Sequence, residues 1–295
     1  RRALQHRHVG CALGHRRHQR HRGGAAADHH DPLAGVVEEK LSLTQGVPLA
    51  IVGVDPPALA EGARVRARRV RTAALEKADL VPDQVTLDAS ARPLISIDGQ
   101  TFLLGIRGLH QADNAVRVWA VVQELDLDRG AAARALEQFT MPGGRGELIQ
   151  EGALTILNDC YNANPQSFRA AIATAAAMRG DRRLVFVAGT MRELGKESAE
   201  LHRQIAGELV DLHPELLAVV GDFVPALTPF AGALQYRLIT APDPPALATR
   251  LAQHLRGDEL VVLKASRGVA LERILPALKA RAKHVDSPGA PLYPR

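Results

Sequence analysis

"ALTILNDCYNANPQSFRAAIATAAAM", residues 153–178, joins an apolar run to an alanine-rich helical pattern through a short polar segment. The apolar run predicts a buried strand, and the segment after it holds Asp159, Tyr161, Asn162 and Asn164. The loop at the carboxyl end of a parallel strand is where α/β sheets bind ligands. Asn164 before Pro165 is also a helix-capping pattern, so this polar cluster indicates either a ligand site or a cap.

The same strand-then-helix pattern recurs to residue 282. Further strands are expected at 183–190, 216–222, 236–240 and 259–266, and further helices at 198–210, 225–234, 243–255 and 269–282. Continuous apolar strands that alternate with amphipathic helices are typical of a parallel sheet covered on both faces. Residues 146–284 are therefore predicted to form a doubly wound, mostly parallel, Rossmann-like α/β domain.

Residues 25–145 are expected to form a different, partial domain. The patterns predict a helix at 35–43, a strand at 48–55, a hairpin around Asp98 and Gly99, and helices at 111–127 and 128–139. The Met-Pro-Gly-Gly run at 141–144 marks a domain junction. Residues 285–295 are rich in proline and are expected to be disordered.

The first 24 residues differ from the rest of the chain. Residues 1–22 hold seven arginines, five histidines and no acid, and we interpret residues 1–24 as a disordered tail or as a stretch outside the natural reading frame. This tail accounts for the net charge of +5, and aromatic residues are only 3% of the chain, so nucleic-acid binding is not expected.

Two distant cysteines and the lack of a long apolar run indicate a cytoplasmic protein without a membrane span.

Two more polar clusters follow expected strands. "AGTMRELGKESAELH" (188–202) supplies Glu193, Gly195 and His202, and "LKASRGVALE" (263–272) supplies Lys264, Ser266 and Arg267. Each cluster has a structural interpretation, in which Gly195 ends a turn, His202 is a solvated helix residue and the cations are surface charges. In a parallel sheet, however, all three clusters would lie at the same edge, where Lys264 and Arg267 could bind a carboxylate or phosphate.

Together the three clusters resemble the C-terminal domain of the Mur ligases. The family reads approximately D-D-S-Y-N-A-N-P, then G-x-M-x-E-L-G with a later histidine, then K-G-S-R-x-x-x-x-E. The Tyr-Asn-Ala-Asn-Pro run resembles the MurF type, which adds D-alanyl-D-alanine to UDP-N-acetylmuramoyl-tripeptide. The resemblance implies ATP-driven amide synthesis through an acyl phosphate, in peptidoglycan and cell-wall synthesis, and we expect a monomer.

The resemblance extends upstream to "GLHQADNAVRVWAV" (108–121), which is similar to the family's G-x-H-N-x-x-N-A with Gln111 in place of an asparagine. "AAADHHDPLAGVVEEK" (25–40) resembles a further family segment, although its spacing is about three residues shorter.

The site residues that the resemblance implies fall into four groups. The ATP-binding residues are His110, Asn114, Arg145 and Asp159. The residues around the dipeptide are Tyr161, Asn162, Asn164 and Arg267. The Mg²⁺ ligands are His29 and a carbamylated Lys40, and the catalytic residues are Lys40, Lys264 and Ser266.

The family's phosphate-binding G-x-x-G-K-[ST] loop does not occur in these 295 residues. We therefore expect the sequence to be a C-terminal fragment, with part of the central ATP-binding domain at 25–145, and to be inactive alone. Two alternatives are a related ligase of the folylpolyglutamate type, suggested by His110-Gln111, and a non-catalytic α/β binding module.

Overall fold

The computed structural model describes residues 32–141 and 143–285 of the chain. The described residues divide into two compact units, with the boundary between Arg71 and Thr72. The first unit contains helices α1 (Pro32–Ser42) and α2 (Pro57–Arg64) and strand β1 (Ala50–Val52), which pairs with β2 (Val70–Thr72). Leu41 of α1 and Ala63 of α2 are buried in its small core. The strand expected at 48–55 is thus only three residues long.

The second unit begins with a three-stranded antiparallel sheet and two helices. The strands are β3 (Gln84–Leu87), β4 (Pro93–Ile97) and β5 (Gln100–Leu103), and the helices are α3 (Leu109–Glu124) and α4 (Arg129–Gln138). The hairpin between β4 and β5 turns at Asp98 and Gly99, which have φ angles of +50° and +71°. Two successive positive φ angles are what a tight Asp-Gly hairpin requires, so the sequence prediction of this turn is confirmed.

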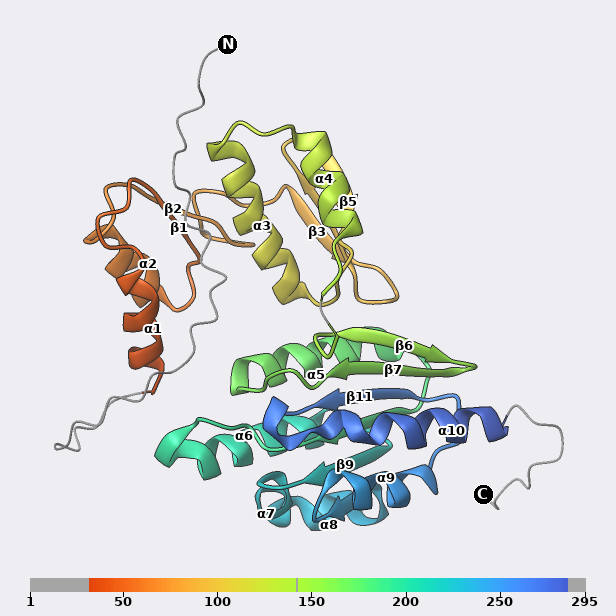
Figure 1. Ribbon diagram of the computed structural model, residues 1–295. Coiled ribbons are helices and arrows are strands. Elements are labelled where there is room, and N and C mark those ends of the chain that lie inside the picture. Colours follow the sequence, from red (N-terminus) through yellow and green to blue (C-terminus); the bar gives the residue numbers. More distant parts are fainter. Residues whose placement is uncertain (1–31, 142, 286–295) are drawn as a thin grey trace. The chain divides into compact units, whose positions relative to one another are not determined.

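A six-stranded sheet forms the rest of the second unit. Its strands are β6 (Glu147–Glu151), β7 (Leu154–Asp159), β8 (Leu184–Ala188), β9 (Leu216–Val220), β10 (Leu238–Ala241) and β11 (Leu260–Lys264). The order across the sheet is β10-β9-β8-β11-β7-β6, and every pair is parallel except β6 with β7. The last strand in sequence therefore lies between β7 and β8, which brings the ends of these three strands together (Figure 1).

Helices cover both faces of this sheet, and alternate strand residues contact them. On one face, Phe186 and Leu157 pack with α5 (Pro165–Arg179), α6 (Ser198–Asp211) and α7 (Phe223–Ala226). On the other, Val185 and Ile156 pack with α9 (Pro244–Ala252) and α10 (Leu275–Val285) (Figure 1). Since a strand turns successive side chains to opposite faces, a strand covered on both sides has to be apolar throughout. The predicted mostly parallel α/β fold is confirmed.

Three details differ from the sequence prediction. Strand β6 was not expected, and it joins the sheet as an antiparallel edge strand through a turn at Gly152, whose φ is +57°. The helix expected at 225–234 is divided into α7, a 3₁₀ turn at Thr228–Phe230 and α8 (Ala231–Leu234), because Pro229 lacks the N–H that a continuous helix needs. The last helix starts as a 3₁₀ turn, Leu271–Ile274, before α10.

Among the described residues, no helix has the length and apolar character needed to cross a membrane.

We expect Phe168→Ala to destabilise the second unit by about 3–5 kcal/mol, because Phe168 is fully buried and its ring contacts those of Phe186 and Phe223. Phe139→Ala removes a side chain that is 46% exposed and should change the free energy of unfolding by less than about 1 kcal/mol. Urea denaturation followed by circular dichroism measures both variants. Similar losses in the two would contradict this description of the core.

Candidate functional site

Three loops meet at the carboxyl edge of the sheet, because they follow the neighbouring strands β7, β11 and β8. Lys264, the last residue of β11, is in register with Asp159 of β7 on one side and with Ala188 of β8 on the other. The loops that carry Tyr161, Glu193 and Ser266 therefore start from adjacent positions. The structure thus brings together the three polar clusters that the sequence singled out.

Lys264 ties the loop after β7 to the centre of the sheet. Its side chain is almost fully buried, and its Nζ donates to Asp159 Oδ2 and to the carbonyl oxygen of Asn162, both at 2.7 Å. Burial raises the pKa of the Asp159 carboxyl, and the Lys264 ammonium opposes that rise. A buried ammonium needs such acceptors, so the loop conformation and the charge of Lys264 depend on each other.

Ser266 and His202 hold the loop after β8. Ser266 Oγ accepts from the N–H of Arg192 at 2.9 Å and donates to the carbonyl oxygen of Ala163 at 3.3 Å. His202 is fully buried; its Nε2 accepts from the N–H of Met191 at 2.9 Å, so its Nδ1 donates to the carbonyl oxygen of Ser198 at 2.7 Å. The interpretation of His202 as a solvated helix residue was therefore wrong, because both ring nitrogens are used inside the fold.

The two asparagines after Tyr161 have different surroundings. Asn164 is the N-cap of α5, where its Oδ1 accepts from Ser167 N at 2.8 Å and Ser167 Oγ accepts from Asn164 N at 3.0 Å. This reciprocal capping box uses the Asn164 side chain locally. Asn162 is exposed, and its Oδ1 accepts from the N–H of Ala163 at 2.8 Å while its amide nitrogen is free to contact a ligand.

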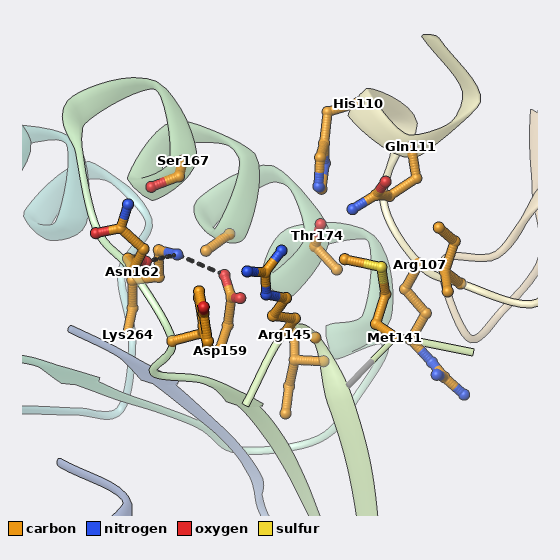
Figure 2. Close-up of a pocket in the computed structure, with 15 residues that line it drawn as sticks. Arg107, His110, Gln111, Met141, Arg145, Asp159, Asn162, Ser167, Thr174 and Lys264 are labelled. Atoms are coloured by element: carbon orange, nitrogen blue, oxygen red, sulfur yellow. Dashed lines mark hydrogen bonds and ion pairs between the residues drawn. The ribbon is translucent and has the colours of Figure 1, made fainter. Parts of the chain in front are cut away.

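A cavity of about 240 Å³ lies beside these loops (Figure 2). Of the residues expected to form the site, it is lined by His110, Arg145, Asp159, Tyr161, Asn162 and Lys264. The lining residues that the sequence analysis did not single out as site residues include Arg107, Met141, Ser167, Ala171 and Thr174. The last three could have been recognised, because residues spaced by three and four positions share one helix face, here on α5.

Asn114, Arg267, Asn164 and Ser266 do not line this cavity. Asn114 is linked to the cavity only indirectly. Its Nδ2 donates at 3.1 Å to Oε1 of Gln111, which lines the cavity. Arg117 Nη2 in turn donates to Asn114 Oδ1 at 2.8 Å. The exposed Asn114 is thus placed to orient Gln111.

The cavity is rich in positive charge. Arg145 and Arg107 both line it, and the Nε atom of each is buried without a hydrogen-bond partner among the described residues. Figure 2 shows the Arg145 guanidinium directed between Asp159 and Thr174, whereas Arg107 turns its guanidinium outward. Partial loss of water around the His110 imidazole lowers its pKa, and the Asp159 carboxylate opposes this. Because Asp159 is already paired with Lys264, the charge of Arg145 is available to an anionic ligand.

The residues expected to bind Mg²⁺ lie elsewhere in the chain. Lys40 is exposed near the end of α1 in the first unit, and His29 lies outside the described residues. Within 32–141 and 143–285, no group of three or more His, Cys, Asp or Glu side chains is arranged to hold a metal ion.

Residues 144–267 match the sequence family described as "Mur ligase, glutamate ligase domain". This stretch runs from the start of β6 past the end of β11 and contains all three loops of the carboxyl edge. Over this stretch the chain is similar to the Mur ligases. The resemblance seen in the sequence is therefore confirmed.

Two proteins similar in sequence to this chain are UDP-N-acetylmuramoyl-tripeptide–D-alanyl-D-alanine ligases. The Treponema pallidum protein is 32% identical over 183 residues, which cover 61% of this chain and 39% of the relative. The Mycobacterium bovis protein is 29% identical over 275 residues, which cover 83% of this chain and 54% of the relative. The chain thus spans about half or less of the length of the Mur ligases it matches.

Solved Mur ligase structures share the fold. MurF from Acinetobacter baumannii superposes with a TM-score of 0.69 at 22% identity, covering 83% of this chain and 56% of that one. MurF from Thermotoga maritima, solved in complex with ADP, has a TM-score of 0.64 at 22% identity and covers 80% and 54%. Folylpolyglutamate synthase from Mycobacterium tuberculosis, complexed with ADP and AMPPCP, has a TM-score of 0.63 at 20% identity and covers 88% and 61%.

Asn164→Ala should lower the free energy of unfolding by about 1 kcal/mol, because it removes the side-chain acceptor of the α5 capping box. Asn162→Ala serves as the matched control, since Asn162 is exposed and caps no helix, and its effect should stay within about 0.5 kcal/mol. Denaturant titration compares the two. Equal stability of both variants would show that the cap contributes little.

Lys264→Met should raise the pKa of the Asp159 carboxyl further, because it removes the ammonium that opposes the effect of burial. Carboxyl ¹³C shifts followed by NMR against pH measure this change, and Lys196→Met, at an exposed position, is the control. A carboxyl whose pKa is raised on folding binds its proton more tightly in the folded state. The stability that Asp159 contributes therefore decreases as pH rises from its usual value of 3.8 through the raised one. An unchanged Asp159 titration in Lys264→Met would contradict the assigned ion pair.

Proposed function

We propose that the chain is the C-terminal part of an ATP-dependent ligase of peptidoglycan precursor synthesis, which adds D-alanyl-D-alanine to UDP-N-acetylmuramoyl-tripeptide in the cytoplasm. The observation that carries this proposal is the convergence of Arg145, Asp159 and Lys264 on one cavity. These three residues lie inside the stretch that matches the Mur ligase domain, and Asp159 and Lys264 end neighbouring strands at the carboxyl edge of the sheet. The names of the two sequence relatives support the choice of substrates.

The cavity suits the base, ribose and phosphates of a nucleotide. The Nε atom of Arg145 is buried without a hydrogen-bond partner among the described residues, and a guanidinium forms strong, directional hydrogen bonds with phosphate oxygens. The Asp159 carboxylate can accept from ribose hydroxyls, and the Gln111 amide can form hydrogen bonds with the edge of a base. The Thermotoga maritima relative was solved with ADP, which supports the choice of nucleotide.

ATP would supply the phosphoryl group that activates the tripeptide carboxylate for amide formation. The described residues contribute binding and order to this reaction. Lys264 fixes the loop after β7, which holds Asn162 at the cavity. Ser266 fixes the loop after β8, which holds Arg192 at the adjoining edge of the sheet. Fixed polar groups avoid the cost of reorganisation when charge develops in a reaction. The described residues do not fit a magnesium site, and we assign no step to the metal through them.

A folylpolyglutamate-type ligase is the second candidate. Gln111, which follows His110 in the cavity wall, favours it, and so does the fold shared with the Mycobacterium tuberculosis folylpolyglutamate synthase. The tripeptide–dipeptide ligase is preferred because its relatives are matched by sequence at 29–32% identity. Addition of D-alanyl-D-alanine or of glutamate, assayed with the longer protein that carries a phosphate-binding loop, separates the two.

Calorimetric titration of the 295-residue chain with ADP tests the nucleotide site. We expect binding, and we expect Arg145→Gln to weaken it about tenfold to a hundredfold, the effect of losing about 1.5–3 kcal/mol from a charged hydrogen bond. Arg203→Gln, at an exposed α6 position paired with Glu200, should bind ADP as the unmodified chain does. Failure of the unmodified chain to bind ADP, or equal binding by Arg145→Gln, would refute the assignment.

A further inference from the structure

The loops after β8 and β11 stay joined beyond the ends of their strands. Ser266 N donates to the carbonyl oxygen of Thr190 at 3.1 Å, and Ser266 Oγ accepts from the N–H of Arg192 at 2.9 Å. The 3₁₀ turn Arg267–Val269 starts directly after Ser266, and we call it the Arg267 turn. The backbone of Arg192 therefore lies beside the start of this turn.

The side chain of Arg192 also holds the Arg267 turn. Its Nη2 donates to the carbonyl oxygen of Gly268, the middle residue of the turn, at 2.9 Å. Within residues 32–141 and 143–285, no acid pairs with this guanidinium. The hydrogen bond to the turn therefore has no ion pair to compete with it.

The Arg192 guanidinium fills the space that a side chain at Gly268 would need. A Cβ built on Gly268 would lie 2.5 Å from Arg192 Nη1, 2.7 Å from Cζ and 3.1 Å from Nε, which is too close for the guanidinium to stay in place. The contact thus depends on glycine at this position. The Mur ligase patterns leave the positions of both residues open, so the resemblance alone does not imply this contact.

The Arg267 turn carries Arg267 to the side of Tyr161. The Arg267 guanidinium lies 5.3 Å from the centre of the Tyr161 ring. Tyr161 lines the first cavity, and together with Cys160 and Arg267 it also lines a second cavity of about 330 Å³. Arg145 most strongly, and Arg267 more weakly, lower the pKa of the Tyr161 hydroxyl. Titration of this hydroxyl therefore reports where Arg267 lies.

We propose that Arg192 is a positioning residue, which holds the Arg267 turn so that Arg267 keeps its place beside Tyr161 in the cavity wall. One hydrogen bond on the surface adds little to the stability of a whole domain, but it can favour one conformation of a three-residue turn. Resting on the proposed function, Arg192 acts on the reaction only through Arg267. A side chain that is already in place loses less conformational entropy when a substrate binds.

The test is the NMR titration of Tyr161 in the 295-residue chain, with ¹³Cζ-labelled tyrosine and with Tyr236 and Tyr293 replaced by phenylalanine. Arg267→Met should raise the pKa of Tyr161, because it removes one of the two cations that lower it. Arg192→Met, which removes the donors of the turn, should raise this pKa by no more than Arg267→Met does. The double variant should titrate as Arg267→Met alone, because Arg192 has no further effect once Arg267 is gone.

Gly268→Ala tests the same contact without changing a charge. The atoms nearest to the added methyl all belong to the Arg192 guanidinium, the flexible end of a side chain. We expect an unchanged melting temperature and a Tyr161 pKa that rises as in Arg192→Met. Gly232→Ala is the matched control, since a Cβ there would meet no atom within 4 Å. Lys196→Gln removes an exposed charge from the same loop, and neither control should change the titration.

Two results would overturn the inference. One is a Tyr161 pKa that stays unchanged in both Arg192→Met and Gly268→Ala. The other is additive effects of Arg192→Met and Arg267→Met in the double variant, because the charge of Arg192 would then act on Tyr161 directly. ADP titration of the unmodified chain tells the two proposals apart: a chain that does not bind ADP refutes the nucleotide site, while the Tyr161 titration still decides the role of Arg192.

Discussion

The buried ammonium of Lys264 is the interaction on which the carboxyl edge depends. A charge that has left water needs acceptors within hydrogen-bond distance, and Lys264 has one acceptor at the end of β7 and one in the loop that follows. One is the Asp159 carboxylate and the other is the backbone carbonyl of Asn162. Because β11 lies between β7 and β8, the same strand end can organise the loops on both sides.

This organisation divides the polar residues of the edge into two groups. Lys264, Ser266 and His202 are buried, and their side-chain hydrogen bonds reach the backbone of neighbouring segments. They are positioning residues in this structure. Arg145 and Asn162 are less buried and turn polar groups toward a cavity, so they are the ones suited to contact a ligand. Residue type alone could not have made this distinction, since both groups are strongly polar.

The sequence predicted most of the second unit's fold because its signals are local. Continuous apolar runs identified β7, β8, β9 and β11, since a strand buried on both faces has no polar position to interrupt it. Strand β6, "ELIQE", was not predicted, because an edge strand is half exposed and has no continuous apolar run. Convergence of the polar clusters also followed from the sheet type, because parallel strands end on the same side.

The parts of the site that the sequence did not reveal depend on contacts between distant residues. His202 looks like any polar helix residue until α6 packs against the loop at Met191, which supplies the N–H that its Nε2 accepts. Asn158 reads as one more residue of a strand, and only its pairing with Glu147 in β6 fixes the direction of its amide. In both cases the hydrogen-bond partner belongs to a different segment of the chain. The sequence around His202 or Asn158 therefore does not identify it.

Tyr161 shows how one strand end can supply two cavities. The residues before it alternate between the faces of β7, so that Asp159 lies at one cavity and Cys160 at the other. Tyr161 then leaves the strand and contributes to both, with the Arg145 guanidinium 3.7 Å from its ring centre and that of Arg267 at 5.3 Å. An aromatic face attracts cations, so the ring can hold two guanidinium groups close together despite their like charge. The two arginines also lower the pKa of the Tyr161 hydroxyl, Arg145 more than Arg267. The side chain of Tyr161 therefore contacts two arginines that come from different parts of the chain.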